Sequence, residues 1–255
     1  MIKKVLYKTP VGDIYFDNKT LFCEQMDLTG TAGVFRSDSL ALSDGQVTTG
    51  VNLQARTIPM SFAFKDRHND AYMRERLAAL FSPLNSGELV VRTDYNTYTI
   101  TVRPKDIPVF TRDKNVSYVW RWNVDFIADF PYWRKGLQQH QATWGGNMYL
   151  TVHNSSLCNV PMEIKFFGGT VTVFGNRTTG SGYFEARPGD NEYIIVNSLN
   201  FTVKNQNGED CNQCIQATTR LDQVYLQPGD NVLELPSSGE VRPVVYWWDL
   251  SLGVI

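Results

Sequence analysis

Polar and apolar residues alternate along most of the first half of the chain, which predicts β-strands. Residues 51–64 alternate, and residues 89–103 predict two strands around a turn at 94–96. Alternation continues across residues 116–126, as expected for a strand with one buried and one wet face. The apolar face of that strand consists of Trp120, Trp122, Val124 and Phe126.

One segment of the first half has the spacing of a helix instead. Within residues 70–81, Met73, Leu77, Leu80 and Phe81 stand at i, i+4, i+7 and i+8, so a helix carries them as one apolar stripe. An isolated helix of about three turns is marginal in water. We therefore expect a helix over about 70–81 that docks its stripe onto a sheet.

Residues 30–50 have a different composition, in which small and polar residues dominate. The few apolar residues, among them Phe35, Leu40 and Leu42, can bury little against their own domain. Two interpretations remain open: a disordered loop, or an arm that becomes ordered on a neighbouring subunit.

The second half of the chain contains short strands separated by turn residues. Turn signals include the tetrapeptide Pro-Gly-Asp-Asn at 188–191 and again at 228–231. This spacing is typical of an antiparallel sandwich. The predicted strands are 148–153, 162–167, 170–174, 182–185, 192–197, 200–204, 214–218, 232–235 and 243–250.

Charge also divides the chain near residue 135. Residues 1–135 hold 18 Lys/Arg and 15 Asp/Glu, whereas residues 136–255 hold 6 and 11. We therefore predict two domains, 1–135 and 136–255, joined by a short linker. The total charge of −2 predicts neither specific nucleic-acid binding nor attraction to anionic membranes, and no apolar run reaches the length of a membrane span.

The sequence contains no pattern typical of a catalytic or cofactor site. Its histidines, His68, His140 and His153, stand in no known catalytic motif, and no phosphate-binding glycine loop occurs. We therefore predict a protein that is not an enzyme, with no catalytic residue, cofactor or metal.

Cys211 and Cys214 form the sharpest local motif, a Cys-x-x-Cys pair. A closed zinc site needs four ligands, and no second pair exists. Together with Cys23 and Cys158 they are expected to be inert thiols in a reducing compartment; a disulfide or a metal site stays open as an alternative.

Aromatic residues from Tyr132 onwards support an alternative function. They could form a flat platform for sugar rings, or they could fill a core and an interface. Because Trp247 and Trp248 are adjacent in a predicted strand, only one of them can face inward. The residues of this possible platform are Trp133, Trp144, Trp247, Trp248, Tyr132 and Tyr246.

The order of these features resembles a known family. The chain has an Ala-Arg-Thr-Ile-Pro-Met-Ser-Phe strand from Ala55, one helix closing on Leu-Phe-Ser-Pro, and an aromatic strand ending Asp-Phe-Pro-Tyr-Trp133. An Asn-Arg-Thr-Thr turn at 176–179 and a Leu-Gln-Pro-Gly-Asp-Asn turn at 226–231 follow. Across its full length the chain resembles the distal tail protein (Dit) of long-tailed, non-contractile bacteriophages.

This resemblance implies a mostly β fold in two parts. The first is a β-sandwich or split-barrel-like domain with one short helix, and the second is a galectin-like antiparallel β-sandwich. Galectins read sugars with a His-x-Asn-x-Arg strand, whereas His153 is followed here by Asn-Ser-Ser. The sugar-binding residues of galectins therefore do not carry over.

The resemblance also implies a structural function. It implies a homo-hexameric ring with a DNA-passing channel, which connects the tail tube to the adsorption apparatus of the virion and assembles in the cytoplasm of the bacterial host. Its partners would be the tail tube protein, the tape-measure protein and the baseplate hub or receptor-binding protein. Residues 30–50 would then be an arm on the next protomer, with Phe35, Leu40 and Leu42 as buried anchors.

Overall fold

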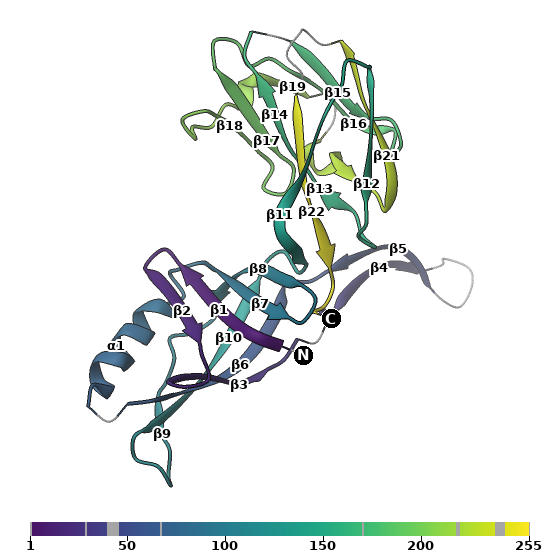
Figure 1. Cartoon of the computed structure of the whole chain (residues 1–255). Helices are drawn as coiled ribbons and strands as arrows, with labels where there is room; N and C mark the ends of the chain where they lie inside the picture. The colour runs from purple at the N-terminus through teal and green to yellow at the C-terminus, as the bar shows by residue number, and fades with distance from the viewer. Residues whose placement is uncertain are drawn as a thin grey trace. The chain divides into compact units, whose positions relative to one another are not determined.

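Two compact units make up the chain in the computed structural model (Figure 1). The first contains residues 1–135 and 251–255, and the second contains residues 136–250. Side chains of residues 35–39 and 46–52 lie outside the described set. The structure describes the backbone of residues 2–28, 30–39, 46–66, 68–169, 171–217, 220–237 and 243–254.

The last residues of the chain belong to the first unit, whereas the sequence assigns them to the second domain. Arg56 explains this return, because its side chain is buried and its Nη2 donates a hydrogen bond to the carbonyl oxygen of Leu252. Val254 packs against the core of the first unit. A buried guanidinium needs acceptors, and the returning backbone supplies one.

Two antiparallel sheets that meet at a corner form the first unit. One sheet has the order β2-β1-β7-β8 and the other the order β10-β6-β3; β8 pairs with β10 only through two residues at its end. The strands are β1 (Ile2–Thr9), β2 (Gly12–Phe16), β3 (Leu21–Met26), β6 (Arg56–Lys65), β7 (Gly87–Thr93), β8 (Thr97–Pro104), β9 (Thr111–Arg112) and β10 (Val119–Ala128).

The core of the first unit is aromatic and lies between these sheets and the helix α1 (Asp70–Leu80). The ring centroid of Phe62, on β6, lies 4.5 Å from that of Phe16, 5.2 Å from that of Trp122 and 5.5 Å from that of Phe81. Leu77 of α1 is also buried, so the predicted stripe does dock. Such rings bury large areas and stack favourably, which holds the helix on the sheets.

Two sheets packed face to face form the second unit. One has the order β18-β17-β14-β22-β11 and the other the order β12-β21-β15-β16-β19. Phe166 of the first sheet lies 6.3 Å from Phe174 and 5.6 Å from Phe184 of the second, measured between ring centroids. The mostly β fold and the antiparallel sandwich predicted from the sequence are therefore confirmed.

The elements of the second unit include two short 3-10 helices. In the described residues, α1 is the only α-helix, and no helix has the length and apolar character to cross a membrane. The elements are β11 (Trp133–Thr143), β12 (Tyr149–Asn154), β13 (Val160–Pro161), β14 (Glu163–Phe167), β15 (Thr172–Asn176), β16 (Ser181–Ala186), β17 (Tyr193–Asn197), β18 (Thr202–Asn205), η1 (Asn212–Cys214), β19 (Ile215–Ala217), η2 (Leu221–Gln223), β20 (Tyr225–Leu226), β21 (Gly229–Ser237) and β22 (Val244–Ser251).

Candidate functional site

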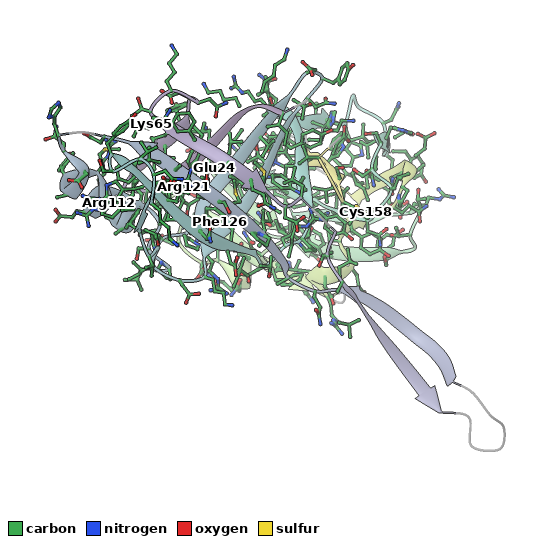
Figure 2. All side chains as sticks on the ribbon, turned by 90° about the horizontal axis from the view of Figure 1, so that it is seen from below. Glu24, Lys65, Arg112, Arg121, Phe126 and Cys158 are labelled. Atoms are coloured by element: carbon green, nitrogen blue, oxygen red, sulfur yellow. A yellow bond between two sulfur atoms is a disulfide. The ribbon has the colours of Figure 1, made fainter. Side chains whose placement is uncertain are left out.

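A β-hairpin occupies the segment that the sequence leaves open between a loop and an arm. Its strands β4 (Gly33–Ser39) and β5 (Gln46–Leu53) form a two-stranded sheet of their own. At its base, Gln54 N donates to Ala32 O at 3.0 Å and Thr31 Oγ1 donates to Gln54 O at 2.7 Å. Figure 2 shows this hairpin extending beyond the other strands of the first unit. The described residues of this segment, 33–39 and 46–53, therefore pair as a hairpin.

Of the three predicted interface residues, Phe35 is the one that lies in a described strand of this hairpin. Phe35 lies in β4 with its backbone opposite Val51, and its side chain is outside the described set. Leu40 and Leu42 lie outside the described residues altogether. Their role as buried anchors on a neighbouring protomer remains a prediction.

Carboxylates neutralise the arginines on the wet face of β10 and beside α1. Arg121, labelled beside Glu24 in Figure 2, donates from Nε to Glu24 at 3.1 Å. It also pairs with Asp113. Nη2 of Arg112 lies 3.6 Å from Oδ2 of Asp70. The excess of basic residues in this half of the chain therefore does not leave these arginines as free cations.

Trp120 lies at the edge of the apolar face of β10. It is half-buried, whereas Trp122, two residues on, is buried. The guanidinium carbons of Arg74 and Arg112 lie 4.3 Å and 4.9 Å from its ring centroid. These cations cover the exposed ring by cation–π attraction.

The tryptophans do not form the exposed platform that the alternative function requires. Trp133, Trp144 and Trp247 are 0%, 3% and 7% exposed. Trp247 stacks on His140 at 5.3 Å between centroids, and its neighbour Trp248 is half-buried. The prediction that only one residue of this adjacent pair faces inward is confirmed.

Cys211 and Cys214 are joined as a disulfide, which corrects the expectation of thiols. The turn of η1 brings their Cα atoms within 5.4 Å, a separation suited to a disulfide. Burial raises the pKa of Cys23 and of Cys158 to about 11, so both stay protonated and unreactive. In the described part of the chain, no cluster of three or more His, Cys, Asp or Glu could hold a metal.

Buried asparagines explain the two turns that carry the family resemblance. Asn231 accepts from Gln227 N at 2.9 Å and donates to Gln227 O at 2.8 Å and Gly229 O at 3.0 Å. Asn176, at the start of the other turn, donates to Tyr225 O at 2.8 Å and to Asn231 Oδ1 at 3.3 Å. One hydrogen-bond network therefore fixes both turns.

Replacing Asn231 by alanine is expected to lower the free energy of unfolding of the second unit by about 2–3 kcal/mol. The change leaves buried backbone groups of the turn without partners, and each unsatisfied group costs about 1–3 kcal/mol. Urea titration followed by circular dichroism measures the loss. Asp230→Ala is the matched control because the Asp230 side chain is exposed. An equal loss of stability in both variants contradicts the claim that the Asn231 hydrogen bonds hold the turn.

A row of polar and aromatic side chains crosses the outer face of the sheet β12-β21-β15-β16. Tyr149 of β12 lies opposite Glu234 of β21, which lies opposite Gly175 of β15. Tyr183 of β16 donates its hydroxyl hydrogen to Glu234 Oε1. Beside them, Arg177 Nη1 donates to Tyr149 Oη at 3.0 Å.

The hydrogen bond to Glu234 raises the pKa of Tyr183 to about 12, with a smaller contribution from burial. Because a raised pKa favours the neutral phenol in the folded state, this contribution to stability is complete below the ordinary pKa of 10.0 and is lost as the pH rises towards 12. Burial likewise raises the pKa of Tyr7 to about 12.

Glu234→Gln is expected to return the pKa of Tyr183 towards its ordinary value, since the amide oxygen carries no charge. A spectrophotometric titration at alkaline pH measures the ionisation of the tyrosines. In the variant, Tyr183 should ionise at a lower pH than in the wild type, whereas Tyr7 should still ionise near pH 12. Glu185→Gln is the control, because Glu185 lies on β16 with Tyr183. This variant should give the same titration curve as the wild type. An unchanged curve for Glu234→Gln would show that burial alone shifts Tyr183.

Part of the first unit is similar to a domain of phage tail proteins. Residues 27–128, from just after β3 to the end of β10, match the model of the phage tail protein RIFT-related domain. The chain therefore carries a domain of phage tail proteins. No curated protein sequence matches it closely.

Solved structures of phage tail proteins share the fold of the whole chain. The Dit protein of phage SPP1, described as a paradigm of the hub adsorption apparatus in phages infecting Gram-positive hosts, has a TM-score of 0.68 at 12% identity, over 98% of this chain and all of that one. Chains of the phage P2 baseplate in its activated conformation, with Ca and with Sr, have TM-scores of 0.61 and 0.62 at 8% and 9% identity, over the whole of both chains. The resemblance to distal tail proteins is therefore confirmed at the level of the fold.

Proposed function

We propose that this chain is the structural hub of a phage tail tip, forming a hexameric ring whose channel passes DNA. The ring connects the tail tube to the adsorption apparatus, and its partners are the tube protein, the tape-measure protein and a baseplate hub or receptor-binding protein. The protein acts without catalysis in the virion and assembles in the cytoplasm of the host.

The β4–β5 hairpin is the observation that carries this proposal. Among the described strands, β4 and β5 pair only with each other. A lone two-stranded hairpin is at best marginally stable in water, and its outer edges offer unpaired backbone groups to another chain. A neighbouring copy in a ring supplies the missing surface, which accounts for a hairpin whose two strands pair with no further described strand.

The pairing of charges in the first unit supports the DNA-passing role. Each contact between a cation and a phosphate adds affinity that slows the passage of DNA. Arg121 and Arg112 have carboxylate partners, as does Arg134, which lies 2.7 Å from Glu88. These side chains therefore have less attraction for phosphate than free cations.

The alternative function, a carbohydrate-binding module in host adsorption, loses its predicted platform through the burial of Trp133, Trp144 and Trp247. Any sugar site on this chain must use other side chains.

Mass in solution tests the hub proposal. Light scattering coupled to size exclusion, at several concentrations of the full chain, is expected to give a stable mass of six times 29.0 kDa. A mass of one chain at every concentration, or a stable assembly of a different number of copies, contradicts the hexameric ring.

A further inference from the structure

The polar and aromatic row on the outer face of the second unit is built from four separate segments. Tyr149, Arg177, Tyr183 and Glu234 come from β12, from the turn after β15, from β16 and from β21. Their inward-facing neighbours, such as Phe174, Phe184 and Leu233, are buried in the sandwich core. The four side chains therefore point away from the core, and Tyr149 is 45% exposed.

Gly175 makes room for one of the two rings. A Cβ atom at this position would lie 2.2 Å from Cε1 of Tyr183, so the Tyr183 ring lies against the bare backbone of β15. Adjacent strands are spaced about 4.8 Å apart. Tyr149 on β12 and the Tyr183 ring over β15 are thus separated by two strand spacings, or about 10 Å.

Both rings are held before any ligand arrives. The guanidinium carbon of Arg177 lies 5.3 Å from the centroid of Tyr149, in addition to its hydrogen bond to the hydroxyl. The bond from Tyr183 to Glu234 fixes the second ring. Fixed side chains lose little conformational entropy on binding, and an arginine with five N–H groups keeps donors for a ligand.

This combination of groups has the chemistry of a sugar site. Tyrosine rings present apolar faces to the C–H groups of a pyranose and keep a polar tip. The guanidinium offers donors and the carboxylate offers an acceptor to sugar hydroxyls, and a few placed polar groups beside aromatic rings fix the orientation of a ligand. We propose that Tyr149, Arg177, Tyr183 and Glu234 form a shallow binding site for a short saccharide.

A shallow site of this size binds weakly in a single copy. The inference does not depend on the hub function, but if six copies share a ring as proposed above, linked sites raise the apparent affinity by a factor of about 10²–10⁴. Weak sites of this kind therefore suit recognition of a repetitive polymer better than of a free monosaccharide.

Two measurements on the full chain test the site. The first applies the wild-type protein to a printed array of bacterial surface saccharides, and we expect binding that falls at least tenfold in Tyr149→Ala and in Arg177→Ala. The matched controls are Tyr95→Ala and Arg220→Ala, because both side chains are highly exposed and lie elsewhere. Thermal melting of each variant checks that it folds.

The second measurement needs no variant. Saccharides that bind on the array are added to isotope-labelled wild-type protein, and NMR spectra record the chemical shifts of its backbone amides. The amides whose shifts change are expected to lie on β12, β21, β15 and β16. The absence of any signal on the array overturns the proposal, as does binding that survives both alanine variants. Chemical-shift changes confined to other strands also overturn the proposal. So does a result in which an added tail protein changes the shifts of this face and no saccharide does.

Discussion

Phe62→Ala is expected to lower the free energy of unfolding of the first unit by about 3–5 kcal/mol, the usual cost of removing a fully buried aromatic ring. Phe62 is 0% exposed, and its ring contacts strands from both sheets and the residue that follows α1. Its loss therefore leaves a cavity where the two sheets and the helix meet. Calorimetry of the full chain measures the shift of the first unit's transition.

Phe22→Ala provides the control for this prediction. Phe22 lies on β3, opposite Ala63 and one position away from Phe62, but it is only half-buried beneath Lys65, whose Nζ is 4.6 Å from the ring centroid. Its replacement should cost about 1 kcal/mol, the size of an exposed cation–π contact. Equal losses in the two variants would mean that the core is not centred on Phe62.

Excision of the hairpin is expected to reduce the proposed assembly of six copies to single chains while leaving the first unit folded. Gly33, Val34 and Leu53 are the hairpin residues whose side chains the structure describes, and none of the three belongs to the core of that unit. Gln54 N already donates to Ala32 O, so an Asn-Gly pair placed between these two residues closes a two-residue turn with this same bond. Light scattering measures the mass of the shortened chain, and thermal melting confirms its fold.

Tyr95→Ala is the control for the excision, because its side chain is 85% exposed in the turn between β7 and β8. We expect this variant to keep the mass of the wild-type assembly. A shortened chain that still forms the full assembly would show that the hairpin is not needed for the interface, even if the ring itself were established.

The alternation of side chains determined much of this fold from the sequence. The buried face of β10, with Trp122, Val124 and Phe126, follows directly from the period of two residues. The stripe of α1 follows from the helical period, and the turn residues predicted most strands of the sandwich. Local geometry and apolar burial are sufficient for these elements, because a one-residue shift would expose the whole apolar face.

Other elements depended on contacts that are distant in the sequence. The sequence predicts no strand over residues 134–143, yet they form most of β11, because strand pairing satisfies the backbone whatever the side chains are. The return of the chain end to the first unit depends on Arg56, nearly two hundred residues away. Neither contact has a local signal.

The candidate sites divide in the same way. The sequence marked residues 30–50 as a segment with little to bury, but only the tertiary structure paired them as a hairpin without further strands. The sequence left open whether the tryptophans form a platform or fill a core, and their burial is decided by which sheet covers them. The row from Tyr149 to Tyr183 had no sequence signal at all, because strand order, and not spacing along the chain, places β12, β21, β15 and β16 side by side.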